Sequence, residues 1–286
     1  MWLILAFGSA ALLGFYDASK KYALKDNAVL PVLLLNTLFS TLIFSPALFS
    51  TAGMGDLTAH LFVFLKAIIV LTSWILGYFG LKHLPITIVG PINATRPIMV
   101  LVGAALIFGE RLNLYQWIGV LLAVVSIFLL SLSSKKEAVD FKHNKWVWCI
   151  AAAALVGAVS GLYDKFIVRR YDPLFVQSWF NLYQLFLMLI IVATVWFPTR
   201  KKTTPFHWSW AIPLISIFLC AADFLYFHAL AQEGAMISVV SLVRRSSVII
   251  SFACGVVIFH EKNLKAKILD LVLILIGMFF IWLGSH

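Results

Sequence analysis

The chain has 286 residues, of which 62% are hydrophobic and only 12% charged, and its formal net charge is +10. A soluble domain of this length needs far more polar surface, so the composition excludes an ordinary soluble enzyme and indicates an integral membrane protein. The basic residues stand mostly in short clusters between apolar stretches. Because no loop is long enough to form a basic domain, we expect the lipid bilayer and no nucleic acid as a partner.

Ten apolar stretches, each long enough to cross a bilayer, follow one another along the chain. They are apolar all round, which favours helices over the alternating strands of a barrel. The sequence therefore predicts an all-α polytopic membrane protein with ten transmembrane helices. The predicted spans are 2–24, 29–50, 60–82, 85–108, 113–133, 146–168, 173–197, 208–232, 236–259 and 264–284.

The two halves of the chain share short motifs in the same order. The matches are GFYD at 14–17 with GLYD at 161–164, Asn36 with Asn181, and IFGER at 107–111 with IFHEK at 258–262. This order indicates a duplication, with a first five-helix repeat at 1–134, a linker loop at 135–145 and a second repeat at 146–286. Because five is odd, the second repeat must be inverted in the membrane, which is typical of secondary transporters. A duplicated scaffold without transport is the alternative.

Loop charges predict the orientation, because lysine and arginine favour the cytoplasmic side. The loops after the first, third, fifth, seventh and ninth spans carry most of these residues, whereas the opposite face holds Arg111, Arg169 and Arg170. We therefore expect a multi-pass protein of the cell (inner) membrane with both termini extracytoplasmic.

The turn that closes the fourth predicted span reads FGERLNLYQWIG (108–119), and its counterpart in the second half reads FHEKNLKAKIL (259–269). With these turns and its 5+5 duplication, the chain resembles the ten-helix EamA-type members of the drug/metabolite transporter superfamily, over essentially its whole length. The resemblance implies export or exchange of amino acids, nucleobases, sugars, phosphorylated metabolites or drugs through a cavity between the halves. It also implies cytoplasmic termini and a basic second loop, whereas the loop Ser50–His60 contains no Lys or Arg.

Three arginines lie near the middle of predicted spans, where a charge is costly and marks a candidate functional site. Arg96 lies in the fourth span, and Arg244 and Arg245 lie in the ninth. Guanidinium groups hold carboxylates and phosphates through paired hydrogen bonds, and secondary transporters bind their substrates at this depth. We therefore expect a small anionic or zwitterionic metabolite as the substrate. The alternative is that the arginines pair with Asp223 and lock the halves together.

Polar and aromatic residues on neighbouring spans complete the expected substrate site. Besides the arginines, the candidates are Asn93, Ser241, Asp223, Trp74, Tyr78, Tyr226, Asn36 and Asn181. The aromatic rings could stack on a substrate, and packing between helices is the alternative reading of the same rings.

Each copy of the GxYD motif places a tyrosine and an aspartate near the end of its span, with a lysine close by. These gate or coupling candidates are Tyr16, Asp17 and Lys20, with Tyr163, Asp164 and Lys165. Under an inverted topology the two copies lie toward opposite sides of the membrane, so we expect them to belong to opposite gates. An aspartate is also a candidate carrier of a coupling proton, because burial favours the neutral form of a carboxyl group. The alternative is an Asp–Lys pair that only neutralises charge.

Other patterns indicate neither catalysis nor cofactors. The histidines are scattered, and Cys149, Cys220 and Cys254 lie in apolar spans without metal-binding spacing, so we expect no metal. A Walker A loop is absent from the sequence, so ATP does not drive the protein directly. Gly157 and Gly161 form a GxxxG motif that favours close helix packing. A membrane-embedded enzyme or carrier for a lipid phosphate is the alternative function, and a homodimer is compatible with the sequence.

Overall fold

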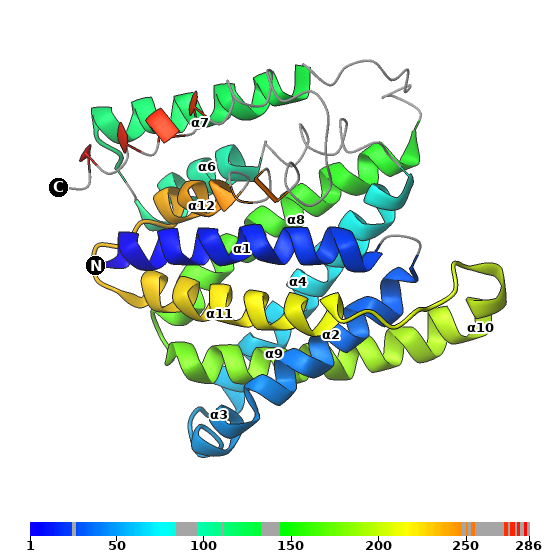
Figure 1. Cartoon of the computed structure of the whole chain (residues 1–286). Coiled ribbons are helices and arrows are strands. Elements are labelled where there is room, and N and C mark those ends of the chain that lie inside the picture. The colour runs from blue at the N-terminus through cyan, green and yellow to red at the C-terminus, as the bar shows by residue number, and fades with distance from the viewer. Residues whose placement is uncertain are drawn as a thin grey trace.

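The computed structural model describes residues 1–24, 27–83, 96–109, 111–132 and 144–247, with short pieces between 250 and 284 (Figure 1). The first half contains α1 (Trp2–Leu24), α2 (Val29–Ile43), α3 (Ser45–Ser50), α4 (Leu57–His83), α6 (Arg96–Phe108) and α7 (Leu114–Leu132). The second half contains α8 (Lys145–Val168), α9 (Pro173–Ile191), α10 (Phe197–Thr199), α11 (Ala211–Ala231) and α12 (Ile237–Arg245). The described residues contain no strand, which confirms the all-α prediction.

Five of the described helices are long and apolar enough to cross a bilayer. They are Trp2–Leu24, Leu57–Gly77, Lys145–Val168, Pro173–Lys202 and Ala211–Ala231. Two shorter apolar helices cover Val29–Ile43 and Leu114–Ser126. These helices confirm a multi-pass membrane protein, whereas large parts of the predicted spans 85–108, 236–259 and 264–284 lie outside the described residues.

Several helix ends differ from the predicted boundaries for local reasons. The predicted span 29–50 is divided at Phe44, so the prediction of one continuous helix there is wrong. Pro46 has no N–H to bond the carbonyl of Leu42, and the Ser45 hydroxyl donates to that carbonyl instead, at 2.8 Å. The helical segment that begins at Pro173 extends beyond the predicted end at residue 197. α9 is followed directly by a π-helical turn (Val192–Trp196), then by α10, and then by a 3₁₀ turn that ends at Lys202.

Two other ends carry ordinary capping groups. Asp172 accepts hydrogen bonds from the N–H groups of Leu174 and Phe175 and so begins α9. Gly109 follows the last residue of α6 with a φ of +63°, a left-handed conformation that favours glycine and ends the helix.

The closest helix pairs join the two halves of the chain. α1 packs along α11, and α4 packs along α8. α2 also contacts α9, and α6 contacts α12. Figure 1 shows that α1 and α8, the first helices of the two halves, run in opposite directions. The core of the protein is therefore the interface between the halves.

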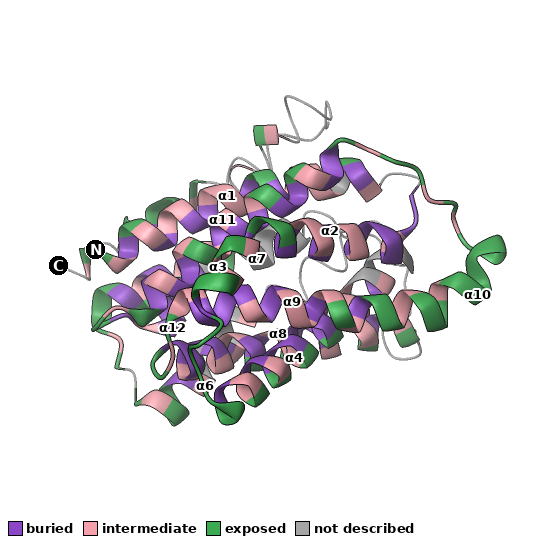
Figure 2. Cartoon of the chain, turned by 90° about the horizontal axis from the view of Figure 1, so that it is seen from below, coloured by how far each residue is buried: buried purple, intermediate pink, exposed green. Residues whose placement is uncertain are grey.

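The outer surface is apolar, and the polar groups are turned inward. Leu61, Leu65 and Ile68 form one exposed stripe on α4, and Figure 2 shows buried residues on the inner faces of the bundle and exposed residues on the outer faces. Buried hydrogen bonds link helices inside: the Ser9 hydroxyl donates to the carbonyl of Ala222 at 2.7 Å. This arrangement is expected for a bundle surrounded by lipid.

Candidate functional site

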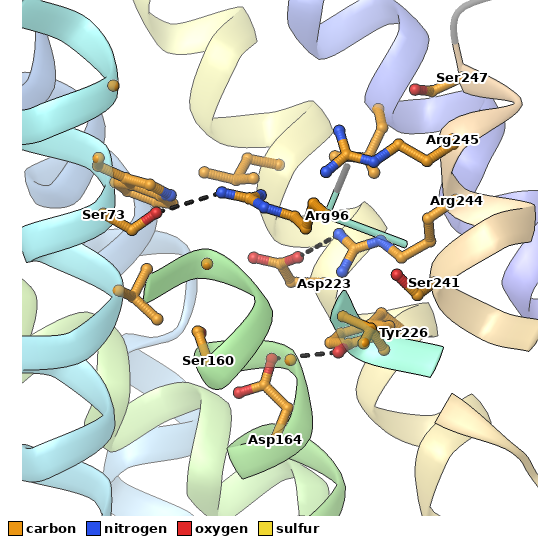
Figure 3. Close-up of a pocket in the computed structure, with 18 of the residues that line it drawn as sticks. Ser73, Arg96, Ser160, Asp164, Asp223, Tyr226, Ser241, Arg244, Arg245 and Ser247 are labelled. Atoms are coloured by element: carbon orange, nitrogen blue, oxygen red, sulfur yellow. Dashed lines mark hydrogen bonds and ion pairs between the residues drawn. The ribbon is translucent and has the colours of Figure 1, made fainter. Parts of the chain in front are cut away.

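A cavity of about 440 Å³ lies between the halves and is lined by α1, α4 and α6 from the first half and by α8, α9, α11 and α12 from the second. Its volume is in the range that holds a small metabolite. Its polar and aromatic lining includes Tyr16, Asp17, Lys20, Lys66, Ser73, Trp74, Arg96, Ser160, Asp164, Asp223, Tyr226, Ser241, Arg244, Arg245 and Ser247. Figure 3 shows that the side chains of Arg96, Arg244 and Arg245 converge on this space from α6 and α12.

Arg96, the first residue of α6, reaches across the cavity to α4 and α8. Its Nη2 donates to the Ser73 hydroxyl at 3.2 Å and to the carbonyl of Ala153 at 3.1 Å. Its Nε is buried without a hydrogen-bond partner. Within the described part of the chain, the guanidinium is therefore held by neutral oxygens alone, and part of its donor capacity is unused.

Gly157 of α8 makes room for this guanidinium. A Cβ at this position would lie 1.9 Å from Arg96 Nη2. A Cβ at Gly161 would lie 3.8 Å from Val100, which is an ordinary packing distance. Both glycines line the cavity, but an added Cβ would displace Arg96 only at Gly157.

Arg244 of α12 is neutralised inside the protein. Its Nη2 donates to Asp223 Oδ1 at 2.8 Å, and its guanidinium lies 4.0 Å from the centre of the Tyr226 ring. Asp223 therefore neutralises one arginine. The alternative drawn from the sequence, in which all the arginines are paired with Asp223, holds for Arg244 alone among the described residues.

Arg245 lines the same cavity beside Arg244. In the part of the chain that the structure describes, neither Arg245 nor Arg96 forms an ion pair with a carboxylate. The arginines are therefore not all locked into internal pairs, and two of them line the cavity without an ion pair to a described carboxylate.

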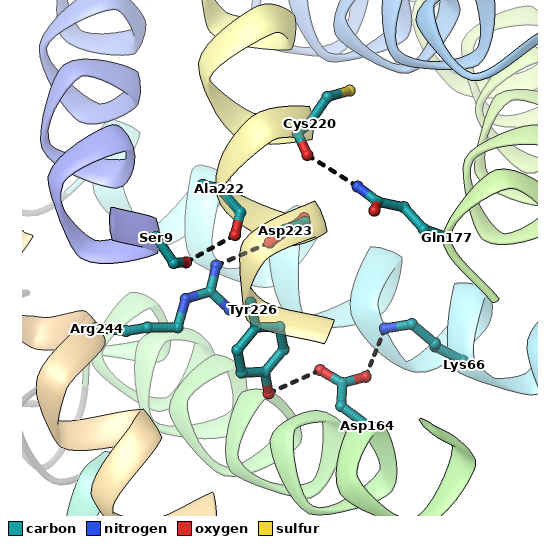
Figure 4. A network of polar contacts seen from close by, with 9 residues as sticks. All are labelled: Ser9, Lys66, Asp164, Gln177, Cys220, Ala222, Asp223, Tyr226 and Arg244. Carbon is teal, nitrogen blue, oxygen red and sulfur yellow. Dashed lines mark hydrogen bonds and ion pairs between the residues drawn. The ribbon is translucent and has the colours of Figure 1, made fainter. Parts of the chain in front are cut away.

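Asp164 of α8 lies in a buried network that sequence reasoning missed in part (Figure 4). Lys66 Nζ of α4 donates to Asp164 Oδ1 at 2.5 Å, and the Tyr226 hydroxyl donates to Oδ2 at 3.2 Å. Lys66 also lies 4.2 Å from the centre of the Phe180 ring. Lys66 was not among the predicted site residues, although a lone lysine inside the predicted span 60–82 carries the same signal as the three arginines.

Asp17 of α1 has a more open environment. Lys20 Nζ donates to Asp17 Oδ1 at 3.1 Å and lies 4.6 Å from the centre of the Tyr16 ring. The side chains of Asp17 and Lys20 are 43% and 23% exposed, whereas those of Asp164 and Lys66 are 9% and 2% exposed. Asp17 lies in the second half of α1 and Asp164 near the end of α8. Because the two helices run in opposite directions (Figure 1), the two aspartates lie toward opposite ends of the bundle.

Four predicted site residues do not line the cavity. Asn36 accepts a hydrogen bond from the Ser216 hydroxyl at 3.0 Å, which links α2 to α11. The main-chain carbonyl of Asn181 accepts a hydrogen bond from Thr41 at 3.0 Å, and its side-chain Nδ2 is buried without a partner among the described residues. The Tyr163 hydroxyl donates to the carbonyl of Phe62, and Lys165 Nζ donates to the carbonyls of Leu230 and Ala235. Tyr163 and Lys165 flank Asp164 in the sequence, and adjacent positions on a helix point in different directions.

Two further candidates lie outside the described residues: Asn93 and the side chain of Tyr78. Trp74, Ser241, Asp223 and Tyr226 join the arginines in the cavity as predicted. Within the described ranges, no group of His, Cys, Asp and Glu side chains is arranged to hold a metal ion, and Cys149, Cys220 and Cys254 are not joined in disulfides.

The chain matches the EamA-like transporter family over residues 1–132 and 144–283. One solved structure, titled only as the crystal structure of a protein, is 16% identical with a TM-score of 0.76, over 99% of this chain and 97% of that one, and shows the fold alone. No curated protein matches the chain. The chain therefore belongs to the EamA-like transporter family, the membrane transporters of the drug/metabolite transporter superfamily that its sequence resembles.

Proposed function

We propose that this protein is a secondary active transporter, an exporter or exchanger of a small anionic or zwitterionic metabolite. The observation that carries the proposal is the meeting of Arg96, Arg244 and Arg245 at a cavity of about 440 Å³ enclosed by both halves. A guanidinium inside a membrane protein is costly unless it serves a ligand or a partner, and only Arg244 has an acidic partner among the described residues.

Alternating access between two inverted five-helix repeats is the mechanism we propose, within a ten-helix chain. Exchanging the repeats would map α1 onto α8 and α4 onto α11, so the pair α1–α11 would become α8–α4. Both pairs are close contacts, and the contacts α2–α9 and α6–α12 each join helices that are equivalent under the same exchange. This pattern supports a pseudo-two-fold axis through the cavity, as inverted repeats require.

The two GxYD motifs are proposed to belong to opposite gates of that cavity. Asp17 and Lys20 form a partly exposed pair toward one end, and Asp164 and Lys66 form a buried pair toward the other. In this arrangement the Asp164 end is closed. Opening that end would require the buried pair to separate or to become hydrated, and either aspartate is a candidate to carry a coupling proton.

The proposed orientation has both termini extracytoplasmic in the cell (inner) membrane. Figure 1 shows the beginning of α8 and the segment after α10 toward one end of the bundle, and the end of α8 and the beginning of α7 toward the other. Lys145 and Arg200–Lys202 belong to the first pair of segments, and Arg111, Arg169 and Arg170 belong to the second. The first group, together with the basic loops of the sequence, supports the first end as cytoplasmic. That the protein forms a homodimer remains a prediction from the sequence.

The proposal is tested by transport in proteoliposomes containing the purified protein. Candidate carboxylates, phosphates and amino acids are screened first by their effect on the thermal unfolding of the wild type. Arg96→Gln, Arg244→Gln and Arg245→Gln are then compared with Arg200→Gln, whose side chain is exposed outside the cavity. We expect the cavity variants to lose transport and the control to retain it; intact transport in all three cavity variants would exclude this site.

Coupling is tested separately with the two aspartates. Uptake is measured with and without a pH gradient for Asp17→Asn and Asp164→Asn. Loss of the gradient effect in one variant identifies the proton carrier, whereas an unchanged gradient effect in both assigns the aspartates to charge neutralisation only.

A further inference from the structure

The charged groups around the cavity do not balance. Its described lining contains five basic side chains, Lys20, Lys66, Arg96, Arg244 and Arg245, and three acidic ones, Asp17, Asp164 and Asp223. Each acid is joined to one base: Asp17 to Lys20, Asp164 to Lys66 and Asp223 to Arg244. Among the described residues, two positive charges remain without a paired acid, and they belong to Arg96 and Arg245.

The two remaining arginines are available to a ligand in different ways. Arg96 donates only to the neutral oxygens of Ser73 and Ala153, and its Nε is buried without a partner. Arg245 faces the cavity with no ion pair to a described residue. Asp17 lies on the same cavity, but Lys20 already holds its carboxylate at 3.1 Å. Neither arginine therefore has a carboxylate of its own.

We propose that the substrate is a soluble dianion, a phosphate monoester or a dicarboxylate, held by Arg96 and Arg245. This inference rests on the proposed function and specifies its substrate class. A dianion would neutralise both guanidiniums through charge-assisted hydrogen bonds. A monoanion or a zwitterion would leave at least one positive charge uncompensated in the cavity.

The same imbalance makes the protein an exchanger. To move from one open state to the other, the cavity must close and lose most of its water. Closing around two uncompensated guanidiniums would bury charges without partners, which is strongly unfavourable. When the cavity closes around a bound dianion, the two guanidiniums and the dianion are buried together with no net charge. The loaded protein therefore changes state far faster than the empty one, and outward movement of one dianion requires inward movement of another.

Binding is tested on the purified full-length protein with pairs of ligands that differ by one charge. At pH 8, methyl phosphate and succinate are dianions, and dimethyl phosphate and monomethyl succinate are their monoanionic counterparts. We expect at least one dianion to bind about tenfold or more tightly than its counterpart by calorimetry, because it gains a second charged contact. Arg96→Gln and Arg245→Gln should each remove this preference, and Arg200→Gln should keep it.

The binding result can overturn the inference in three ways. They are equal affinity for both members of each pair, failure of both dianions to bind, and an unchanged preference in both cavity variants. A short-chain phosphatidic acid carries the same phosphate monoester on a lipid. If it alone bound, the ligand would be a lipid phosphate and the soluble dianion would be excluded.

Exchange is tested in proteoliposomes loaded with the radiolabelled dianion that binds. We expect efflux to be at least tenfold faster with the same dianion outside than with dimethyl phosphate or buffer outside. Equally fast efflux into buffer would exclude exchange. Transport of an amino acid without any dianion would keep the proposed function and overturn this inference. Dianion binding without movement of any solute would overturn both the proposed function and the exchange, and would leave only a dianion-binding site.

Discussion

The two GxYD motifs have nearly the same sequence and very different surroundings. Asp17 is 43% exposed and is paired with Lys20 of its own helix, three residues away. Asp164 is 9% exposed and is paired with Lys66, which comes from a different helix in the other half of the chain. Tyr226 adds a third helix to the second site. The repeated motif therefore supplies the aspartate, and the packing of helices supplies its partner.

This difference distinguishes the two ends of the cavity. A partly exposed ion pair contributes little stability and is easily separated. A buried pair is weakly stabilising as a whole, but the loss of one member leaves a charge without water or a partner. The Asp164 end is thus the end where a single substitution should have the greatest effect, and the Asp17 end should tolerate change.

The largest effect is expected from Lys66→Met. This variant leaves the Asp164 carboxylate buried with only the Tyr226 hydroxyl, and it should lower the free energy of unfolding by about 3–5 kcal/mol. Thermal unfolding of the purified protein in detergent measures the change. Adding Asp164→Asn to Lys66→Met removes the stranded charge and should restore most of the loss. A single variant as stable as the wild type would mean that the buried pair does not hold this end closed.

A smaller effect, on the affinity for the anion, is expected from substituting Gly157 of α8. Gly157→Ala places a methyl group against the Arg96 guanidinium, whereas Gly161→Ala meets only Val100 at 3.8 Å. We expect Gly157→Ala to displace Arg96 and to weaken anion binding about tenfold, equivalent to about 1.4 kcal/mol. Gly161 also lines the cavity, but Gly161→Ala leaves Arg96 in place and should weaken binding less than Gly157→Ala does. Calorimetry on both variants decides, and equal affinities would show that the position of Arg96 does not matter to the ligand.

The smallest effect on stability is expected from Asp17→Asn. Its pair with Lys20 is partly exposed, so the substitution should change the free energy of unfolding by only about 0–1 kcal/mol. The same unfolding assay compares it with Asp164→Asn, which disturbs the buried pair and should be less stable. A larger loss for Asp17→Asn than for Asp164→Asn would reverse the comparison between the two ends.

Much of the site follows from a single physical rule. Charges inside apolar spans are costly, so Arg96, Arg244, Arg245 and Asp223 were predicted as site residues, and all four line the cavity. The rule also applies to Lys66, which the predicted site does not include. The sequence could not supply the pairing between Lys66 and Asp164, since that depends on how α4 packs against α8.

The predictions that did not reach the cavity relied on motif position instead. Asn36 and Asn181 match between the halves, yet neither lines the cavity. Asn36 bonds Ser216 of α11, as polar residues in membrane helices often do between neighbouring helices, whereas only the main-chain carbonyl of Asn181 accepts a hydrogen bond from α2. Tyr163 and Lys165 flank Asp164, but a helix turns by about 100° per residue, so their side chains bond main-chain carbonyls outside the cavity.

The sequence was sufficient to predict the all-α fold class and the ends of several helices. α1 and α8 begin and end within a residue of the predicted boundaries, because each is one apolar stretch without a proline. The break at Phe44 and the extension of α9 to Lys202 depend on local backbone geometry around Pro46 and Val192–Trp196. Average hydrophobicity does not report such geometry.

Alternating access is tested most directly by the accessibility of a cysteine placed in the cavity. Cys149, Cys220 and Cys254 are first replaced by alanine, and Ser160→Cys is introduced on the cavity side of α8, with Ser9→Cys as a buried control outside the cavity. During exchange of a transported solute, a membrane-impermeant thiol reagent should label residue 160 from either side of the membrane and residue 9 from neither. Labelling of residue 160 from one side only would contradict a cavity that opens alternately at its Asp17 and Asp164 ends.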